Sequence, residues 1–159
     1  MSSKTLCAMV RTAVIAAAVC GLAVCCYFLP ALGADIAKNN PEFAYCYLPW
    51  LLFLLAASLP CFAILGLVWI VSVAINKEQV FTVRTARIVK MSAILLLCDV
   101  GFFFCGNIAF LLLDMSHPSV LLISLFVDVF GVSLALLAAV LSRYLTKAAV
   151  LQEEADGTI

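Results

Sequence analysis

Apolar residues run almost unbroken through four stretches of the chain, with short polar segments between them. The stretches are residues 12–32, 48–75, 91–113 and 119–142, and each contains at least 21 residues. A helix needs about 20 residues to cross the hydrocarbon core of a bilayer. Because the runs are continuously apolar rather than alternating, they favour helices over the strands of a membrane barrel. The pattern predicts an all-α integral membrane bundle of four transmembrane helices.

The polar segments leave no room for a separate soluble domain, so residues 1–159 are predicted to form a single membrane domain. Residues 33–47 are expected to be a loop with a polar centre. Residues 114–118 form a tight turn, which makes the third and fourth helices an antiparallel hairpin. The remaining segments are a loop over residues 76–90 and a tail over residues 143–159.

Lysine and arginine are distributed unevenly among these segments. Eight of the nine lie in the N-terminal segment, the 76–90 loop and the tail, whereas the other two connections hold only Lys38. The eight are Lys4, Arg11, Lys77, Arg84, Arg87, Lys90, Arg143 and Lys147. Basic residues concentrate on the cytoplasmic side of membrane proteins. Both termini and the 76–90 loop are therefore predicted to be cytoplasmic.

The composition excludes several classes of function. Hydrophobic residues make up 67% of the chain and charged residues 11%, and the mean hydropathy is +1.23. A soluble domain is nearer half apolar and a quarter charged, so a soluble enzyme is a poor interpretation. Nine basic residues balance nine acidic ones, and no direct nucleic-acid binding is expected from that balance.

Two acidic residues, Asp99 and Asp128, lie inside the predicted third and fourth helices. An acid within a span is costly and is by default a functional hypothesis. Both lie at similar depth, so the hairpin can bring them face to face to share a proton. The pair is then a proton relay or cation site, or else two neutral acids that join helices by hydrogen bonds, which is the commoner case. Asn107 in the third helix can extend this polar line.

The eight cysteines and the single histidine offer little for redox or metal chemistry. No C-x-x-C pair occurs, and six cysteines lie within spans, where cysteine acts as a small hydrophobe. His117 lies alone in a turn, so no metal site and no cofactor are predicted. The sequence does not decide whether Cys46 forms a disulfide with Cys25 or Cys26. The flanks of the two acids match no aspartic peptidase motif, so no catalytic residue is identified and the chain is not expected to be an enzyme.

The 76–90 loop carries a basic face. Thr82 is predicted to cap a helix in which Arg84, Arg87 and Lys90 recur at every third residue. Such a face suits the anionic headgroups of a bilayer, and a cytoplasmic protein partner is the alternative.

The tail is predicted to prolong the fourth helix beyond Ser142, because apolar residues keep helical spacing there. This apolar face comprises Leu141, Leu145, Ala148 and Leu151. The end of the tail is acidic and can lie against the basic 76–90 loop. The acidic residues are Glu153, Glu154 and Asp156.

Three segments resemble a known family. The ending LQEEADGTI is similar to the LQEENDLTI-like ending of the bacterial DUF2975 membrane proteins, FTVRTARI at residues 81–88 resembles their cytoplasmic segment, and so does YLPW at residues 47–50. Thr85 and Gly157 depart mildly from the family pattern. The resemblance implies a small bacterial inner-membrane protein of uncharacterised function, often encoded beside a helix-turn-helix regulator, with no catalytic residue to carry over.

The sequence thus favours a non-enzymatic regulatory or interaction protein that works through its cytoplasmic loop and tail. The alternatives are a small proton- or cation-coupled transporter that uses the intramembrane acids, and a membrane enzyme, for which the signatures are missing. The expected surroundings are the lipid bilayer; a homo-oligomer and a cytoplasmic protein partner stay open.

Overall fold

The computed structural model describes residues 3–76 and 81–156, which are almost entirely helical and contain no strand. The first helical segment comprises α1 (Ser3–Ala23), the π-helical turn η1 (Val24–Phe28) and α2 (Leu29–Asn39). The 3₁₀ turn η2 (Pro41–Cys46) leads into α3 (Tyr47–Asn76). The remaining helices are α4 (Val83–Leu112) and α5 (Pro118–Asp156). The all-α prediction is confirmed.

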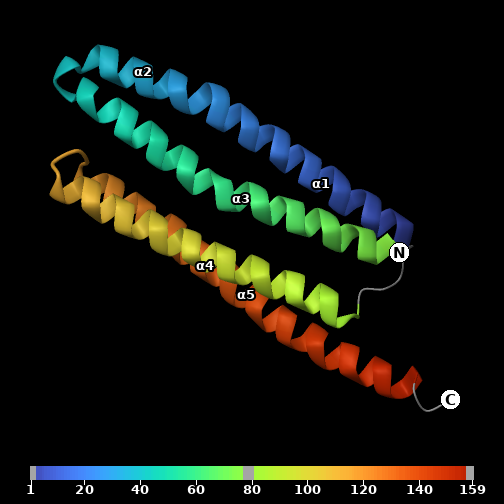
Figure 1. The fold of residues 1–159 in the computed structure, drawn as a ribbon. Helices are drawn as coiled ribbons and strands as arrows, with labels where there is room; N and C mark the ends of the chain where they lie inside the picture. The colour runs from blue at the N-terminus through green and yellow to red at the C-terminus, as the bar shows by residue number, and fades with distance from the viewer. Residues whose placement is uncertain (1–2, 77–80, 157–159) are drawn as a thin grey trace.

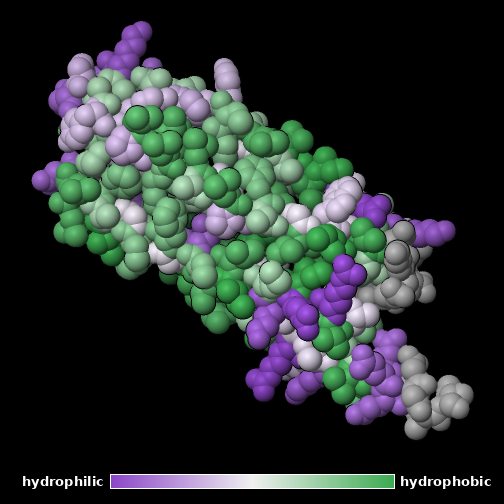
Figure 2. Space-filling view, viewed as in Figure 1, coloured by the Kyte–Doolittle hydropathy of each residue, from purple (hydrophilic) through white to green (hydrophobic). Residues whose placement is uncertain are grey.

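Four helical segments are long and apolar enough to cross a membrane, judged by length and composition. They are Lys4–Asn39, Pro41–Ile75, Val83–Leu112 and Pro118–Glu154. Each is longer than the apolar stretch that predicts it, because the helix continues beyond at least one end of that stretch. Figure 2 shows the result: hydrophobic side chains cover the middle of the molecule and hydrophilic ones gather at its two ends.

The helices pack in the order of the chain. α1 lies against α3, α3 against α4, and α4 against α5, and across the described residues no extensive contact joins α1 to α5. Figure 1 shows two antiparallel hairpins side by side, with α3 and α4 as the neighbours between them. The predicted bundle is therefore an open row, in which α1 and α5 are the outer members.

Among the described helices, α4 and α5 share the most extensive contact, because small residues line both helices where they meet. Ala86 and Ala93 of α4 are buried, and so are Ala135, Ser142 and Ala149 of α5, each set at seven-residue intervals. A seven-residue repeat keeps one seam of a helix against its partner, and small side chains let the backbones approach closely. The turn predicted over residues 114–118 closes this hairpin, since α4 ends at Leu112 and α5 begins at Pro118.

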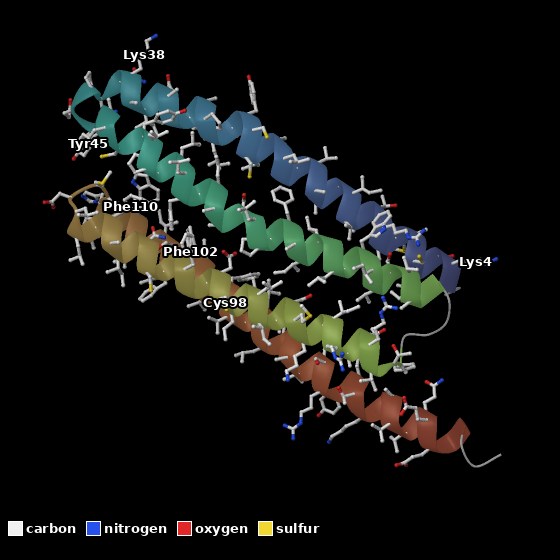
Figure 3. The ribbon with its side chains drawn as sticks, viewed as in Figure 1. Lys4, Lys38, Tyr45, Cys98, Phe102 and Phe110 are labelled. Atoms are coloured by element: carbon white, nitrogen blue, oxygen red, sulfur yellow. The ribbon has the colours of Figure 1, made fainter. Side chains whose placement is uncertain are left out.

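Aromatic rings join the two hairpins. Phe53 of α3 is buried and stacks on Phe103 of α4 at 5.6 Å between ring centroids, and Trp50 stacks on Phe110 at 4.6 Å. Phe102 and Phe110 lie between α3 and α4 in Figure 3. A Cβ built at Gly106 would collide with the Phe53 ring, so this glycine lets the ring pack against the α4 backbone.

The first connection between the apolar stretches differs from its prediction. The expected loop over residues 33–47 is mostly helical: α2 continues to Asn39, and only Asn40 breaks the helix before η2 begins at Pro41. The residue before a proline is disfavoured in the α conformation, which explains the break at Asn40. Pro60 lies inside α3, which is one continuous helix from Tyr47 to Asn76. In the 76–90 segment, α4 begins at Val83, as expected for a helix capped by Thr82.

Candidate functional site

Asp128 is buried in the seam between α4 and α5. Its side chain is 6% exposed, and it borders a cavity of about 390 Å³ whose walls include Val100, Gly101 and Phe104 of α4. Both of its carboxyl oxygens are buried, and neither has a hydrogen-bond partner among the described residues. Asp128 lies seven residues before Ala135, so it occupies the same seam as the small residues.

Asp99 belongs to a different interface. Its Oδ2 accepts a hydrogen bond from Cys61 Sγ of α3 at 3.5 Å, while its Oδ1 is buried without a partner in the described part of the chain. The predicted face-to-face pair that shares a proton is therefore not formed. Asp99 links α4 to α3, and Asp128 faces α4 from α5. The α4–α5 seam continues from Ala93 to Val100 at the same seven-residue interval. Asp99 precedes Val100 and therefore lies off that seam, on the side of α4 that faces α3.

Asn107 does not extend a polar line to the acids by a hydrogen bond. It is 1% exposed, and its Nδ2 donates to the carbonyl oxygen of Phe103, one turn earlier in α4, at 2.8 Å. It lies eight residues from Asp99, or about 12 Å along a helix. Its side-chain amide therefore bonds to the backbone of its own helix.

Besides Cys61, Cys7 also donates a tertiary hydrogen bond, and Cys7, Cys25 and Cys46 are buried. All eight are free, including Cys46, so the disulfide left open by the sequence is not formed. Cys7 Sγ donates to the carbonyl oxygen of Ser72 at 3.1 Å. Within residues 3–76 and 81–156, no three His, Cys, Asp or Glu side chains lie close enough together to hold a metal ion.

Arg11 ties α1 to α3 beside that bond. Its Nε donates to Ser72 Oγ at 3.3 Å, and its guanidinium carbon lies 5.3 Å from the centroid of the Trp69 ring. A guanidinium over an indole face is attracted by the ring quadrupole. Arg11 thus serves structure as well as adding to the basic end of the molecule.

The residues of the predicted basic face lie at the start of α4. Thr82 caps α4, since its side chain accepts a hydrogen bond from the backbone amide of Thr85, and this prediction is confirmed. Arg84, Arg87 and Lys90 are exposed on the first turns of α4. Arg143 and Lys147 of α5 are exposed near them along the antiparallel hairpin, as are the side chains of Lys4 and its neighbours on α1. Lys4 and Lys38 lie at opposite ends of the molecule in Figure 3. Lys77 lies outside the described residues.

The last turns of α5 project beyond α4. Ser142 Oγ donates to the carbonyl oxygen of Ala86 at 2.8 Å, which sets the register of the hairpin. α5 continues for 14 residues after Ser142, to Asp156, whereas α4 begins at Val83, three residues before Ala86. Figure 1 shows α5 extending past the start of α4. The predicted prolongation of the fourth helix is confirmed.

The buried face of this extension differs from the predicted one. Leu145 and Ala149 are buried, but Leu141 and Leu151 are 54% and 65% exposed. The seam follows the small residues at seven-residue intervals, which turns Leu141 and Leu151 outward. Glu153 and Glu154 lie exposed on the last described turns. Gly157, the expected end of the helix, lies outside the described residues, and contact between the acidic tail and the basic loop stays a prediction.

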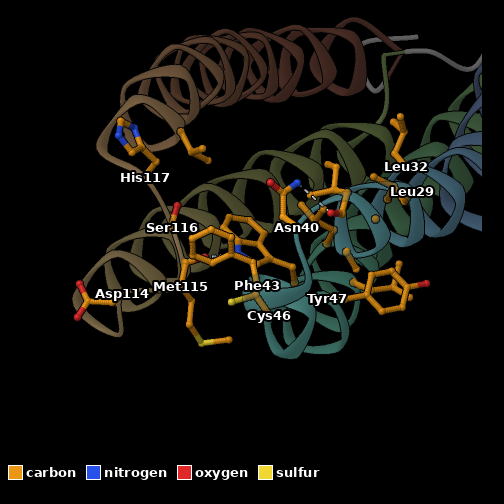
Figure 4. Close-up of a pocket in the computed structure, with 17 residues that line it drawn as sticks. Leu29, Leu32, Asn40, Phe43, Cys46, Tyr47, Asp114, Met115, Ser116 and His117 are labelled. Atoms are coloured by element: carbon orange, nitrogen blue, oxygen red, sulfur yellow. Dashed lines mark hydrogen bonds between the residues drawn. The ribbon is translucent and has the colours of Figure 1, made fainter.

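A second cavity lies at the opposite end of the molecule, and the sequence analysis does not predict it. Its volume is about 680 Å³, and its walls come from α2, η2, the start of α3 and the turn between α4 and α5 (Figure 4). The signal in the sequence was the group of aromatic residues Phe43, Tyr45, Tyr47 and Trp50. The position of the 114–118 turn opposite them depends on packing between the hairpins.

Trp50 connects that turn to α3. Its Nε1 donates to the carbonyl oxygen of Met115 at 2.9 Å, between residues 65 positions apart. His117 caps α5 in the same turn, since its Nδ1 accepts from the backbone amide of Ser119 at 3.3 Å. This end of the molecule is thus held by specific hydrogen bonds from both hairpins.

Residues 31–159 match the family DUF2975, which is described as a protein of unknown function. The match covers most of the chain, so the chain belongs to the DUF2975 family. No curated protein and no solved structure matches it.

Proposed function

We propose that this chain is a multi-pass protein of the bacterial cytoplasmic membrane that acts as a regulatory or interaction protein rather than as an enzyme. It presents its basic face and the projecting end of α5 to the cytoplasm, and a cytoplasmic protein binds there. The observation that carries this proposal is the extension of α5 beyond the start of α4.

The charge distribution supports the orientation. The end that holds the start of α1, the start of α4 and the last turns of α5 carries Lys4, Arg84, Arg87, Lys90, Arg143 and Lys147 as exposed basic side chains. The other end carries Lys38 with three acids, Asp35, Glu42 and Asp114. Basic residues next to a span favour the cytoplasmic side, and they also attract anionic headgroups.

The extension of α5 has the chemistry of a docking element. Tyr144 and Leu151 are each 65% exposed, and Glu153 and Glu154 follow on the same helix. Exposed apolar residues beside charged ones on a preformed helix suit a groove on a partner protein, since the helix needs no ordering on binding.

The test is photocrosslinking from two leucines of α5. A photoreactive amino acid replaces Leu151 in one variant and Leu141 in the other, because these residues have similar exposure and lie ten positions apart on one helix. We expect a discrete protein adduct from position 151 and lipid adducts alone from position 141. Replacing Glu153 and Glu154 by lysine is expected to abolish the protein adduct. Lipid adducts alone at both positions would show that the extension binds no protein.

A second candidate function is a small proton- or cation-coupled transporter, and Asp128 is the observation that favours it. Its carboxyl is buried beside a cavity and has no hydrogen-bond donor among the described residues, which makes it costly to keep in an apolar helix. The test is ion flux in proteoliposomes. A pH- or cation-driven flux that disappears in Asp128→Asn would support transport, and no flux from the wild-type protein would exclude it.

A further inference from the structure

The cavity of about 680 Å³ at the end opposite the basic face has the size of a small-molecule site. It opens between the two hairpins, with α2, η2 and α3 on one side and the α4–α5 turn on the other (Figure 4). Most of its wall is aliphatic or aromatic, which suits a ligand with a large apolar body. The aliphatic wall includes Leu29, Leu32, Ile36, Leu51 and Leu54.

Aromatic rings line the cavity with their polar atoms already used. Trp50 Nε1 donates to Met115 O at 2.9 Å, and Tyr47 Oη donates to Pro30 O at 3.4 Å. With Phe43, these side chains offer ring surface to a ligand. The electron-rich face of an aromatic ring attracts cations, and indole attracts them most strongly.

Asp114 is the one charged residue among those that line the cavity. It stands at one edge in Figure 4, in the turn between α4 and α5, and its φ of 55° belongs to that turn. Asp35 and Glu42 lie at the same end of the molecule. Among the described residues, Lys38 is the one lysine or arginine at this end, and His117 is the one histidine. The charge around the cavity is therefore acidic and favours a positively charged ligand.

We infer that this cavity binds a lipophilic organic cation, meaning a quaternary or protonated centre that carries bulky apolar groups. The apolar groups fill the aliphatic and aromatic wall, and Asp114 with the ring faces stabilises the positive charge. The inference is independent of the proposed function, because the cavity lies at the other end of the molecule from the basic face.

Two ions of the same shape and opposite charge test the inference. Tetraphenylphosphonium and tetraphenylborate are titrated into the purified protein in an uncharged maltoside detergent, with empty micelles as the blank. A Trp69→Phe variant leaves Trp50 as the single tryptophan, so its fluorescence reports the cavity wall. Equilibrium dialysis of the unmodified protein gives the same comparison without any substitution. We expect saturable binding of the phosphonium and none of the borate.

Asp114→Asn and Glu42→Gln are the matched variants, since each removes one acid from this end but only Asp114 lines the cavity. Asp114→Asn is expected to weaken phosphonium binding about fivefold, as expected for one exposed charge pair. Glu42→Gln is expected to leave the affinity unchanged. Equal binding of the two ions, the absence of saturable binding, or equal effects of the two variants would each overturn the inference.

Discussion

Ser142 Oγ donates a buried hydrogen bond of 2.8 Å to the carbonyl oxygen of Ala86, 56 positions away in the chain. Both residues belong to the seam of small side chains between α4 and α5. The alanines of this seam give little directional preference, so we expect this hydroxyl to contribute to selecting the register of the two helices. That register also determines how far α5 projects beyond α4.

Replacing Ser142 by alanine is expected to destabilise the hairpin by about 0.6–1.7 kcal/mol, the usual range for one hydrogen bond between membrane helices. Ser133→Ala is the matched control. Ser133 lies on the same helix but is exposed and donates to Val129 O in its own helix, so its loss is expected to change little. Unfolding in mixed micelles measures both. Equal stability of the two variants would show that the Ser142 bond does not select the register.

Gly106 and Gly101 give a second comparison, on α4. A Cβ at Gly106 would collide with the Phe53 ring, whereas a Cβ at Gly101 would meet nothing within 4 Å. Gly106→Ala is therefore expected to separate the hairpins and to cost about 1–3 kcal/mol, the range for overpacking a core. Gly101→Ala is expected to be neutral or slightly stabilising, because alanine favours the helix. Unfolding in mixed micelles measures the free energy of both variants. If Gly106→Ala left the free energy of unfolding unchanged, the close packing of Phe53 against α4 would be contradicted.

Features that depend on neighbouring residues could be predicted from the sequence. The Thr82 cap, the turn over residues 114–118 and the prolongation of α5 each follow from a few adjacent side chains, and the structure shows all three. The break at Asn40 is equally local, since Pro41 follows it. The polar residues around Asn40 favour a loop in a sequence-based prediction, yet polar residues also continue a helix beyond a membrane span.

The placement of the acids could not be predicted in the same way. Both helices are apolar on every side, so hydropathy does not reveal which face packs inward. The spacing of small residues indicates the packed face of each helix. These residues repeat at seven-residue intervals, as Ala86 and Ala93 on α4 and as Ala135 and Ser142 on α5. That seam carries Asp128 inward. The cavity at the far end depends on segments far apart in the sequence, which no local pattern can bring together.

The orientation of the chain is tested by labelling single cysteines. In a background without the eight native cysteines, Asn39→Cys is expected to react with an impermeant thiol reagent on intact cells, and Arg84→Cys is expected to react only after lysis. Both positions are exposed, so accessibility depends on the side of the membrane alone. The uneven distribution of basic residues is the reason for this expectation. Labelling of Arg84→Cys on intact cells would place the basic face outside.

Asp128 gives the last prediction, because its stability effect and its functional effect are expected to have opposite signs. Its two oxygens are buried without a donor in the described part of the chain, at a seam position where the neighbouring members are Ala135 and Ser142. Removing an unsatisfied polar group relieves its desolvation cost, and alanine fits this seam. Asp128→Ala is therefore expected to stabilise the fold by about 1 kcal/mol.

Asp99→Ala loses the bond from Cys61 and is expected to give no such gain. Unfolding in mixed micelles compares the two variants. A loss of stability in Asp128→Ala would mean that the carboxyl holds α5 to α4, as an interhelical hydrogen bond would. A gain in stability together with the loss of ion flux in Asp128→Asn would identify an acid kept for transport at the expense of the fold.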